Sequence, residues 1–540
     1  MKSYRYFVCF LSLVLLITFH ACAQPSLGRD EAFDYGTTIL SLEQITETDK
    51  LNAAIKRLNK VYLNKNQKNY KGADTVFTIL HMGDSHIQGN FFTGAIRKQL
   101  QYYFGNAGQG VLFPYALAQS YGPKGVEVKV KGKWKGAKTM TQNLKYNLGL
   151  SGYGAFINTA NCSLRVSFNE KLDVDAPLNK LAPVRKINIW HSVGQNSFST
   201  QLDEDFRLID SKLFPSGWGV STFLAEESRS NFTIKPTTTD GGQSYYGFYG
   251  FELLPLEQRG INYYNCGVVG AQFSHLIQNA SFALEQIKYL KPDILIFSFG
   301  TNEAYNRNFN ASNYIMMVEN FITEIQKISP NTAVIFTTAP DTRSRGKIPP
   351  HQTDVNQALK SIAKNTSSAV YDLNAAMGGW GSMITWYRKQ LSIGDKLHFN
   401  TDGYAIQGTL LSFSLLQLYN KQNARDTLDL NPVRRSIDYA MRLLVKENAK
   451  KEINDTTTTD TLRLNHQVEH TVDSITPQKK ETQKLTLNKA KKKFHVVKKG
   501  DTLSHIARIY HVSTKSVAKA NNISLKSLLR QGQKLQIPAR

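Results

Sequence analysis

Cysteine is scarce in this 540-residue chain, which contains only four. Two of them lie within the first 23 residues, and the remaining Cys162 and Cys266 do not have the spacing of a metal site. In an exported protein these two could form one disulfide, and the sequence leaves that pairing open. The glycines of 241–250 lack the strand-to-helix setting of a phosphate loop. We therefore expect no metal and no cofactor.

A long apolar run is also missing. The longest apolar stretch near the N-terminus is Phe7–Phe19, which follows a short positive region and is too short to span a bilayer. It ends just before the small-x-small sequence of residues 21–23, so residues 1–23 have the pattern of a secretory signal peptide. The alternative is a bacterial lipoprotein with a lipid anchor at Cys22, although residues 19–21 match the usual Leu-small-small sequence poorly.

Acidic residues are outnumbered, with 42 Asp and Glu against 66 Lys and Arg, which gives a formal net charge of +24. Residues 479–540 alone hold 16 basic and two acidic side chains, so more than half of the excess lies there. A basic tail favours polyanions such as nucleic acid or an anionic cell envelope, or simply solubilises the surface. Because export is expected, we expect no nucleic-acid partner.

Apolar strands and amphipathic helices alternate along much of the chain. The predicted strands are residues 75–81, 260–264, 293–299, 333–338 and 370–373. The predicted helices between and after them are residues 91–104, 273–290, 314–328 and 403–419. This alternation predicts an α/β fold with a doubly wound parallel sheet and helices on both faces.

Two regions depart from that alternation. Residues 121–258 contain short alternating runs punctuated by Gly, Ser, Asn and Thr, which predicts an inserted β-sandwich module. Residues 426–493 contain one amphipathic helix followed by a Thr-, Asp-, Lys- and Gln-rich flexible linker. The expected domains are therefore a signal peptide (1–23), a first α/β part (24–120), the insert (121–258), a second α/β part (259–425), helix and linker (426–493) and a C-terminal domain (494–540).

Candidate catalytic side chains follow the first and last predicted strands. Ser85 ends a Gly-Asp-Ser turn at the start of a helix, where the carboxyl edge of a parallel sheet gathers ligands and developing negative charge is stabilised. Asp395 and His398 precede the closing helix, and the aspartate can hold the Nδ1 proton while Nε2 faces a serine. Either motif alone also fits an ordinary turn or a solvated loop.

Two further turns could supply oxyanion donors. Asn302 lies in the Gly-Thr-Asn-Glu turn that follows the strand 293–299, and its side-chain amide can donate to an oxyanion. Gly270 ends the turn after the preceding strand, where a glycine lets a backbone N–H approach a substrate closely, and Gly267 is the alternative donor. Each turn taken alone also fits an ordinary loop.

Together and in this order, the four blocks resemble the SGNH (GDSL) hydrolase family over roughly 75–120 and 259–420. The resemblance implies that Ser85 is the nucleophile, that His398 is the general base and that Asp395 orients it. It also implies an oxyanion hole.

The implied oxyanion hole consists of the backbone N–H groups of Ser85 and Gly270 and the side-chain amide of Asn302. One departure is Glu303, which stands where the family commonly has aspartate. Asn302 is the functional position of that block, so the implied role is unaffected.

Finer details resemble the peptidoglycan O-acetylesterases of Gram-negative bacteria. They are the sequences GDSH at 83–86, FFTG at 91–94, FGNAG at 104–108 and GTNEA at 300–304. Those enzymes carry a β-sandwich similar to a carbohydrate-binding module between the first and second blocks, which matches the predicted insert.

The C-terminal segment resembles a LysM domain of βααβ order. Val497–Ala507 is similar to its opening, and Asn521-Asn522 with Leu528–Pro538 are similar to its second half. The resemblance implies binding of N-acetylglucosamine-containing glycans, above all peptidoglycan. The implied glycan site is formed by Gly500, Asp501, Thr502, Leu503, Asn522 and Ile523.

We therefore expect an exported serine esterase of the periplasm or cell envelope that removes O-acetyl groups from N-acetylmuramic acid and is held on peptidoglycan by LysM. One alternative is an acetylesterase or lipase acting on another ester, such as an acetylated polysaccharide, because a triad does not select the alcohol. The other is a non-catalytic peptidoglycan-binding protein.

Overall fold

The chain forms two compact units, Met1–Thr457 and Thr458–Arg540. In the larger unit the computed structural model describes residues 40–65, 74–123, 125–168, 184–344 and 346–444. In the smaller unit it describes residues 493–497, 503, 506–507, 510, 512–524, 529 and 531–538. The predicted signal peptide with Cys22 and most of the predicted linker lie outside the described residues.

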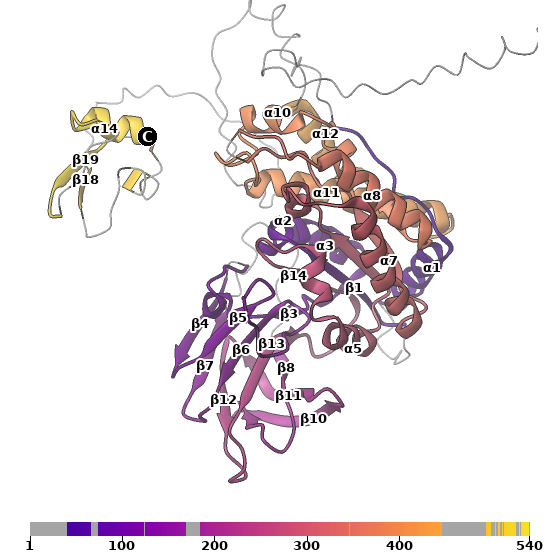
Figure 1. The fold of residues 1–540 in the computed structure, drawn as a ribbon, viewed down its shortest axis with the longest axis vertical. Coiled ribbons are helices and arrows are strands. Elements are labelled where there is room, and N and C mark those ends of the chain that lie inside the picture. Colours follow the sequence, from indigo (N-terminus) through magenta and orange to yellow (C-terminus); the bar gives the residue numbers. More distant parts are fainter. Residues whose placement is uncertain are drawn as a thin grey trace, which may run out of the picture. The chain divides into compact units, whose positions relative to one another are not determined.

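A six-stranded parallel sheet lies at the centre of the α/β part of the larger unit (Figure 1). In spatial order its strands are β2 (Asn106–Gly108), β14 (Gly260–Gly267), β1 (Val76–Gly83), β15 (Ile294–Ser298), β16 (Ala333–Thr337) and β17 (Ala369–Tyr371). From β1 the chain continues to β2 on one side of the sheet, and from β15 it continues to β16 on the other side. The carboxyl ends of β1 and β15 therefore flank a topological switch point, where such sheets bind ligands.

Helices cover both faces of this sheet (Figure 1). On one face lie α1 (Asp49–Asn64), α3 (Phe91–Phe104), α11 (Thr401–Gln422) and α12 (Asn431–Leu443). On the other face lie α4 (Phe273–Ile277), α5 (Ala280–Leu290), α7 (Ala311–Ile328) and α8 (Gln352–Asn365). Four short helices complete the α/β part: α2 (Ser85–Gln88), α6 (Thr301–Ala304), α9 (Leu373–Ala376) and α10 (Ser382–Arg388). The predicted doubly wound fold is confirmed.

The strand β1 shows why both faces must be covered. Phe77 and Ile79 belong to the core beneath α1, α3 and α11, whereas Leu80 and Met82 belong to the opposite core. Successive side chains of a strand point to opposite faces, so a strand that is apolar throughout needs a packed layer on each side. The helices α3 and α11 approach closely at Gly408, where a Cβ would lie 2.4 Å from the carbonyl oxygen of Phe92.

Between β2 and β14 the chain forms two antiparallel sheets, the β-module (Figure 1). One sheet contains β10 (Phe206–Phe214), β11 (Trp218–Arg229), β8 (Val184–Ser192), β13 (Tyr246–Leu254), β6 (Tyr153–Ile157) and β5 (Lys135–Lys138), with β3 (Val111–Leu112) paired to β13. The other contains β4 (Val126–Lys131), β7 (Ser163–Phe168), β12 (Asn231–Thr237) and β9 (Ser199–Gln201). The 3₁₀ helix η2 (Tyr115–Ala118) follows β3. Because β3 joins the first sheet, the module draws in residues that precede 121.

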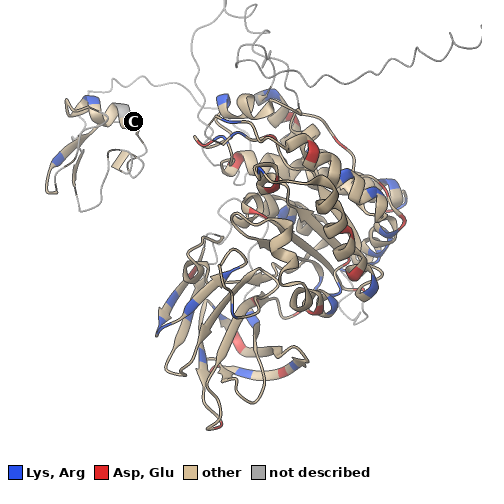
Figure 2. Cartoon of the chain, viewed as in Figure 1, with Lys and Arg blue, Asp and Glu red and all other residues tan. Residues whose placement is uncertain are grey.

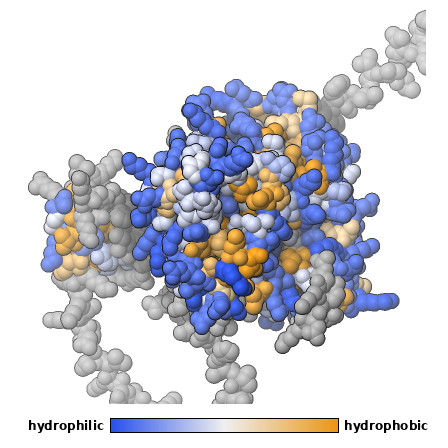
Figure 3. Space-filling model, turned by 90° about the horizontal axis from the view of Figure 1, so that it is seen from below, coloured by the Kyte–Doolittle hydropathy of each residue, from blue (hydrophilic) through white to orange (hydrophobic). Residues whose placement is uncertain are grey.

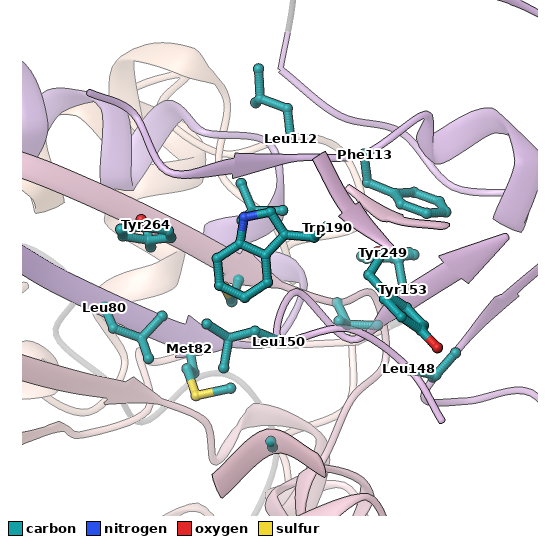
Figure 4. Close-up of a cluster of buried hydrophobic side chains, with 14 of the residues drawn as sticks. Leu80, Met82, Leu112, Phe113, Leu148, Leu150, Tyr153, Trp190, Tyr249 and Tyr264 are labelled. Atoms are coloured by element: carbon teal, nitrogen blue, oxygen red, sulfur yellow. The ribbon is translucent and has the colours of Figure 1, made fainter. Parts of the chain in front are cut away.

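The β-module and the α/β part share one hydrophobic core. Leu80 and Met82 of β1 lie in the same cluster as Leu150 and Trp190 of the module (Figure 4). Within the module, the rings of Phe232 on β12 and Phe251 on β13 approach to 5.6 Å between centroids, so its two sheets pack face to face. The two parts therefore pack as one body.

The smaller unit contains β18 (Lys493–Val496), α14 (Thr514–Ala520) and β19 (Lys534–Ile537), with β18 and β19 paired antiparallel. Asn521 links the helix to the sheet, since its side chain donates to Val517 O and Gln536 O and accepts from Gln536 N. The two strands and this helix agree with the predicted βααβ order, whose first helix falls mostly outside the described residues.

Basic and acidic residues are interspersed along the ribbon of the larger unit (Figure 2). The face seen in Figure 3 is mostly hydrophilic, with hydrophobic groups between. No helix among the described residues is both long and apolar enough to cross a membrane. Cys162 and Cys266 are both buried and both free, so the disulfide that the sequence left open is not formed.

Candidate active site

Ser85 lies where β1 ends and α2 begins. Gly83 closes the strand, and a Cβ there would lie 2.4 Å from the carbonyl oxygen of Ser298 on β15, so no larger residue fits. Asp84 caps α2, because its Oδ1 accepts a hydrogen bond from His86 N–H at 2.9 Å. The chain therefore turns sharply at the edge of the sheet and places Ser85, 8 % exposed, at the switch point.

Two hydrogen bonds connect Ser85, His398 and Asp395. Ser85 Oγ lies 2.9 Å from His398 Nε2, and His398 Nδ1 lies 2.8 Å from Asp395 Oδ2. With its proton on Nδ1, the imidazole donates to Asp395 and accepts the hydroxyl proton of Ser85 at Nε2. The structure thus brings Ser85 together with Asp395 and His398, which follow it by more than 300 positions, in the arrangement of nucleophile, base and orienting carboxylate.

The carboxylate of Asp395 is held in place on both of its oxygens. Its Oδ1 accepts hydrogen bonds from the backbone N–H groups of Leu397 and His398, each at 2.9 Å. Partial burial raises the pKa of Asp395, but the hydrogen bonds from His398 and Leu397 outweigh it and bring that pKa below the ordinary value. Asp395 is therefore ionised at neutral pH and fixes the tautomer of His398.

The loop that carries these two residues is closed by its own backbone. Ile393 N–H donates to His398 O at 3.0 Å, and a bridge joins Ser392 to Phe399. Lys396 adopts a left-handed conformation with φ of 52°, which makes the turn tight enough for the Asp395 carboxylate to reach back to His398. The positions of these side chains are thus set by the turn.

Asn302 is tied to the glycine turn that follows β14. Its Nδ2 donates to Ala271 O at 2.9 Å, which leaves its second amide N–H for another acceptor. Gln272 Nε2 in turn donates to Asn302 O at 3.1 Å.

Gly270 has φ of 75°, and its backbone N–H makes no hydrogen bond within the described residues. Gly267, the alternative donor, lies against α2, where a Cβ would be 2.5 Å from Gln88 N.

Gln88 is a contributor that the motifs did not reveal. Its Oε1 accepts from Val269 N–H at 2.6 Å, which fixes the turn ending at Gly270. Its Nε2 donates to Ser120 Oγ at 2.8 Å and to Tyr121 O, which ties α2 to the first loop of the β-module. The sequence did contain one indication of this role, because Gln88 stands three residues after Ser85 on the same short helix.

His86 directly follows Ser85 on α2 and packs beside His398. Its Nδ1 lies 3.1 Å from Tyr404 OH, and its ring centroid lies 5.5 Å from that of His398. Burial and then the neighbouring His398 lower the pKa of His86 to about 3. The His86 imidazole is therefore neutral at physiological pH, so it packs against His398 without adding charge to the site.

Two buried carboxyl groups lie beneath the site. Glu303 accepts backbone hydrogen bonds from Phe273 at 2.7 Å and from Gly300 at 3.0 Å, so its longer side chain joins the turn after β15 to the start of α4. Burial raises the pKa of Glu303 to about 7. Burial, reinforced by Glu303, raises the pKa of Asp84 to about 8.

These raised values predict a pH-dependent stability. In the unfolded chain both groups ionise near pH 4, whereas the native state holds their protons until about pH 7 to 8. The stabilisation is therefore complete below about pH 4 and is lost progressively as the pH rises towards 7 to 8. We expect the free energy of unfolding to fall by up to roughly 7 kcal/mol between pH 5 and pH 8. Urea denaturation at several pH values measures it.

The variant Asp84→Asn should flatten this dependence, because it removes the more strongly shifted group. The exposed Asp438→Asn on α12 is the matched control and should keep the unmodified slope. A parallel pH dependence in Asp84→Asn and the unmodified chain would contradict the assignment.

The predicted glycan residues of the smaller unit are placed only in part. Leu503 is 4 % exposed and packs in the core of this unit, so its side chain is not on the surface. Asn522 has φ of 51° at the end of α14, and Ile523 N–H donates to Ala518 O at 3.1 Å. Residues 500–502 lie outside the described part of the chain.

Two further buried histidines, one in the parallel sheet and one in the β-module, are hydrogen-bonded to neighbouring groups. His81 is fully buried, with Nδ1 2.7 Å from Tyr263 OH and Nε2 2.7 Å from Ser298 Oγ. His191 is bound by Ser192 O and Ser221 Oγ, both at 2.8 Å. Among the described residues no group of three or more His, Cys, Asp or Glu side chains could hold a metal ion.

Two family models match the chain. Residues 233–406 match the GDSL-like lipase/acylhydrolase family, and residues 495–538 match the LysM domain. The chain carries a GDSL-like acylhydrolase domain. It is an esterase, as predicted, and the LysM domain follows at its C-terminus. The GDSL-like match contains three of the four motif blocks, and β1 brings the Ser85 block to them in space.

Solved structures of other proteins are similar to this chain to different extents. A structure of a peptidoglycan O-acetylesterase is 22 % identical, covers 71 % of this chain and 100 % of its own, and has a TM-score of 0.58. A lipase/acylhydrolase from Enterococcus faecalis is 22 % identical over 30 % of this chain and 78 % of its own, with a TM-score of 0.23. An acetylxylan esterase from Geobacillus stearothermophilus is 19 % identical over 30 % and 73 %, with a TM-score of 0.24. None of the curated proteins matches the chain significantly.

Proposed function

We propose that this protein is a serine O-acetylesterase that removes acetyl groups from peptidoglycan outside the cytoplasm. In this proposal Ser85 is the nucleophile, His398 is the general base and Asp395 orients the imidazole. The observation that carries the proposal is the chain of hydrogen bonds from Ser85 Oγ through His398 to Asp395 at the switch point of the sheet.

The first half of the reaction forms an acetyl-enzyme. Ser85 Oγ attacks the acetyl carbonyl carbon while His398 Nε2 takes the hydroxyl proton. The negative charge that develops on the carbonyl oxygen is stabilised by the backbone N–H groups of Ser85 and Gly270 and by the free amide N–H of Asn302. The bond from the carbonyl carbon to the sugar oxygen then breaks, and His398 gives its proton to that oxygen.

The second half releases acetate. A water molecule attacks the acetyl carbon while His398 Nε2 takes one of its protons, and the same three N–H groups stabilise the oxyanion again. The bond to Ser85 Oγ breaks and the proton returns to that oxygen. Every proton is carried by His398, which is why the ionised Asp395 must hold its tautomer throughout.

Three observations support peptidoglycan as the substrate. The structural match to a peptidoglycan O-acetylesterase covers the whole of that chain and 71 % of this one. The LysM domain belongs to a class that binds N-acetylglucosamine-containing glycans. The N-terminal sequence has the pattern of an export signal, and export places the chain where peptidoglycan lies.

The test is acetate release by the mature protein from O-acetylated peptidoglycan and, in parallel, from acetylated xylan. Release from peptidoglycan is expected. Release from xylan alone would contradict the proposed substrate and favour an esterase for another acetylated polysaccharide. Release from neither polymer and from no small ester would contradict catalysis and favour a glycan-binding protein.

Removal of the LysM unit should weaken action on the polymer. We expect a chain ending at Thr457 to show a KM for O-acetylated peptidoglycan raised at least about tenfold, because a tethered binding domain raises the effective substrate concentration by larger factors. Turnover of 4-nitrophenyl acetate, which LysM has no reason to bind, serves as the reference. An unchanged KM for the polymer would contradict a role of LysM in substrate capture.

A further inference from the structure

A cavity of about 520 Å³ opens where the β-module meets the α/β part. Its walls are the loop 139–148 of the module and the segment from His275 in α4 to Asn279. We propose that this cavity binds a sugar residue of the polymeric substrate next to the sugar that carries the reacting acetyl group. The inference rests on the proposed function and adds a subsite to it.

One wall of the cavity lies beside the glycine turn of the candidate active site. A Cβ built on Gly270 would lie 3.8 Å from Met140 Cε, which is part of the cavity wall. Thr139 is held against the same turn, because Gly152 packs between Thr139 and Val268, with a Cβ position 2.6 Å from Val268 and 3.3 Å from Thr139. A chain of sugars with one acetyl group at Ser85 therefore has the cavity beside it.

The opposite wall is joined to the oxyanion donor Asn302. His275 Nδ1 accepts a hydrogen bond from Gln272 N–H at 2.8 Å, and Gln272 Nε2 donates to Asn302 O at 3.1 Å. An imidazole that accepts at Nδ1 is neutral and carries its proton on Nε2, which makes His275 a donor for a sugar oxygen. Burial also lowers the pKa of His275, which is consistent with a neutral ring.

The lining of the cavity has the chemistry that recognises sugars. Five amide side chains line it: Gln142, Asn143, Asn147, Gln278 and Asn279. Each amide can both donate and accept, as sugar hydroxyl and N-acetyl groups require. Such a lining does not suit an apolar acyl chain, which needs a mostly apolar pocket.

The charge and the volume of the cavity further restrict the class of ligand that it can bind. None of the residues that line the cavity is acidic, and Lys145 adds one positive charge. The cavity therefore suits a neutral sugar or one that bears a carboxylate. Its volume lies in the ordinary range for small-molecule sites and is sufficient for a sugar residue. Asn279 Nδ2 donates to Leu148 O at 2.9 Å, so the two walls are braced against each other without a ligand.

Two other cavities of the described chain lack this combination. A cavity of about 230 Å³ between η2 and β4 is lined mainly by apolar and aromatic residues. A cavity of about 470 Å³ is polar, but it lies on α1, α7 and α8, among Lys50, Glu319 and Asn320. Nothing in the structure links this last cavity to the glycine turn, so it offers a matched control.

The test is the double variant Asn147→Ala/Gln278→Ala, which changes two exposed side chains from opposite walls. The measured quantity is the ratio of kcat/KM for the O-acetylated polymer to kcat/KM for 4-nitrophenyl acetate. We expect this ratio to fall about tenfold through a higher KM for the polymer, since two hydrogen bonds of ordinary strength are lost. The control Lys50→Ala/Asn320→Ala should keep the unmodified ratio.

An unchanged ratio in Asn147→Ala/Gln278→Ala would overturn the subsite. An equal loss on both substrates would overturn it too, because it would indicate a structural effect on the acyl site. The proposed function is judged separately, on the unmodified chain. If that chain deacetylates xylan and not peptidoglycan, the proposed substrate fails, and the subsite is judged by the same ratio measured on xylan.

Discussion

Ser85→Ala is expected to lower kcat for the hydrolysis of 4-nitrophenyl acetate by about 10⁵- to 10⁶-fold, the loss typical when a serine nucleophile is removed. Without Oγ no acetyl-enzyme forms, and only slow attack by water remains, assisted by the oxyanion donors. Because Oγ lies 2.9 Å from His398 Nε2, the deletion also leaves the base without its proton donor. Release of 4-nitrophenol, with acetate release from the polymer alongside, measures the effect.

A buried serine elsewhere provides the control. Ser382 at the start of α10 is fully buried, and its Oγ has no hydrogen-bond partner within the described residues. Ser382→Ala should therefore keep full activity. A fluorophosphonate should label the unmodified chain and Ser382→Ala but leave Ser85→Ala unlabelled. Hydrolysis by Ser85→Ala at more than about a hundredth of the unmodified rate would exclude Ser85 as the nucleophile, since nucleophile loss costs far more than that.

His398→Ala is expected to lower kcat by a similar factor, about 10⁵- to 10⁶-fold, because an unassisted serine hydroxyl is a weak nucleophile. The more discriminating result concerns the double variant. Residues that act as one unit lose their contribution together, so Ser85→Ala/His398→Ala should be no slower than either single variant. Additive losses in the double variant would show that the two residues act independently, contrary to the proposed mechanism.

The chain contains a closely matched control for this pair. His351 Nδ1 lies 3.0 Å from Asp354 Oδ2, in a surface pair with the same three-residue spacing and similar exposure to His398 and Asp395. No serine hydroxyl is bound to His351 in the described part of the chain. His351→Ala should therefore leave kcat within about twofold of the unmodified value, as expected for a surface substitution. A large loss of kcat in His351→Ala would show that the assay reports the stability of the protein and not the function of the triad.

The sequence predicted the fold where local patterns sufficed. Apolar runs such as 75–81 and 293–299 became β1 and β15, because a strand buried on both faces has a continuous apolar signature that needs no partner to be recognised. The short polar turns after these strands were recognisable because they interrupt the apolar runs. The order of the four blocks and the LysM-like segment were therefore visible without any structure.

The arrangement of the β-module depended on distant partners. Val111–Leu112 pairs with β13, about 140 residues later, so the sequence at that point gave no sign that the module draws in residues before 121. Cys162 and Cys266 look like a disulfide pair in composition alone, but each is buried as a free thiol. Pairing of strands and of cysteines depends on three-dimensional contact, which a local pattern does not contain.

The sequence by itself determined which chemistry is present: a serine, a histidine and an aspartate in turns after strands, an amide and a glycine in two others, and a basic LysM-like tail. Only the tertiary structure decided how these meet. It placed Ser85 Oγ 2.9 Å from a histidine 313 residues away. It also brought Gln88 into a hydrogen bond that fixes the glycine turn. Finally, it set the loop 139–148 against α4, which forms a cavity beside Gly270. The physical reason is that side-chain identity and local periodicity are properties of short segments, whereas hydrogen bonds and cavities between remote segments arise only when the shared core packs.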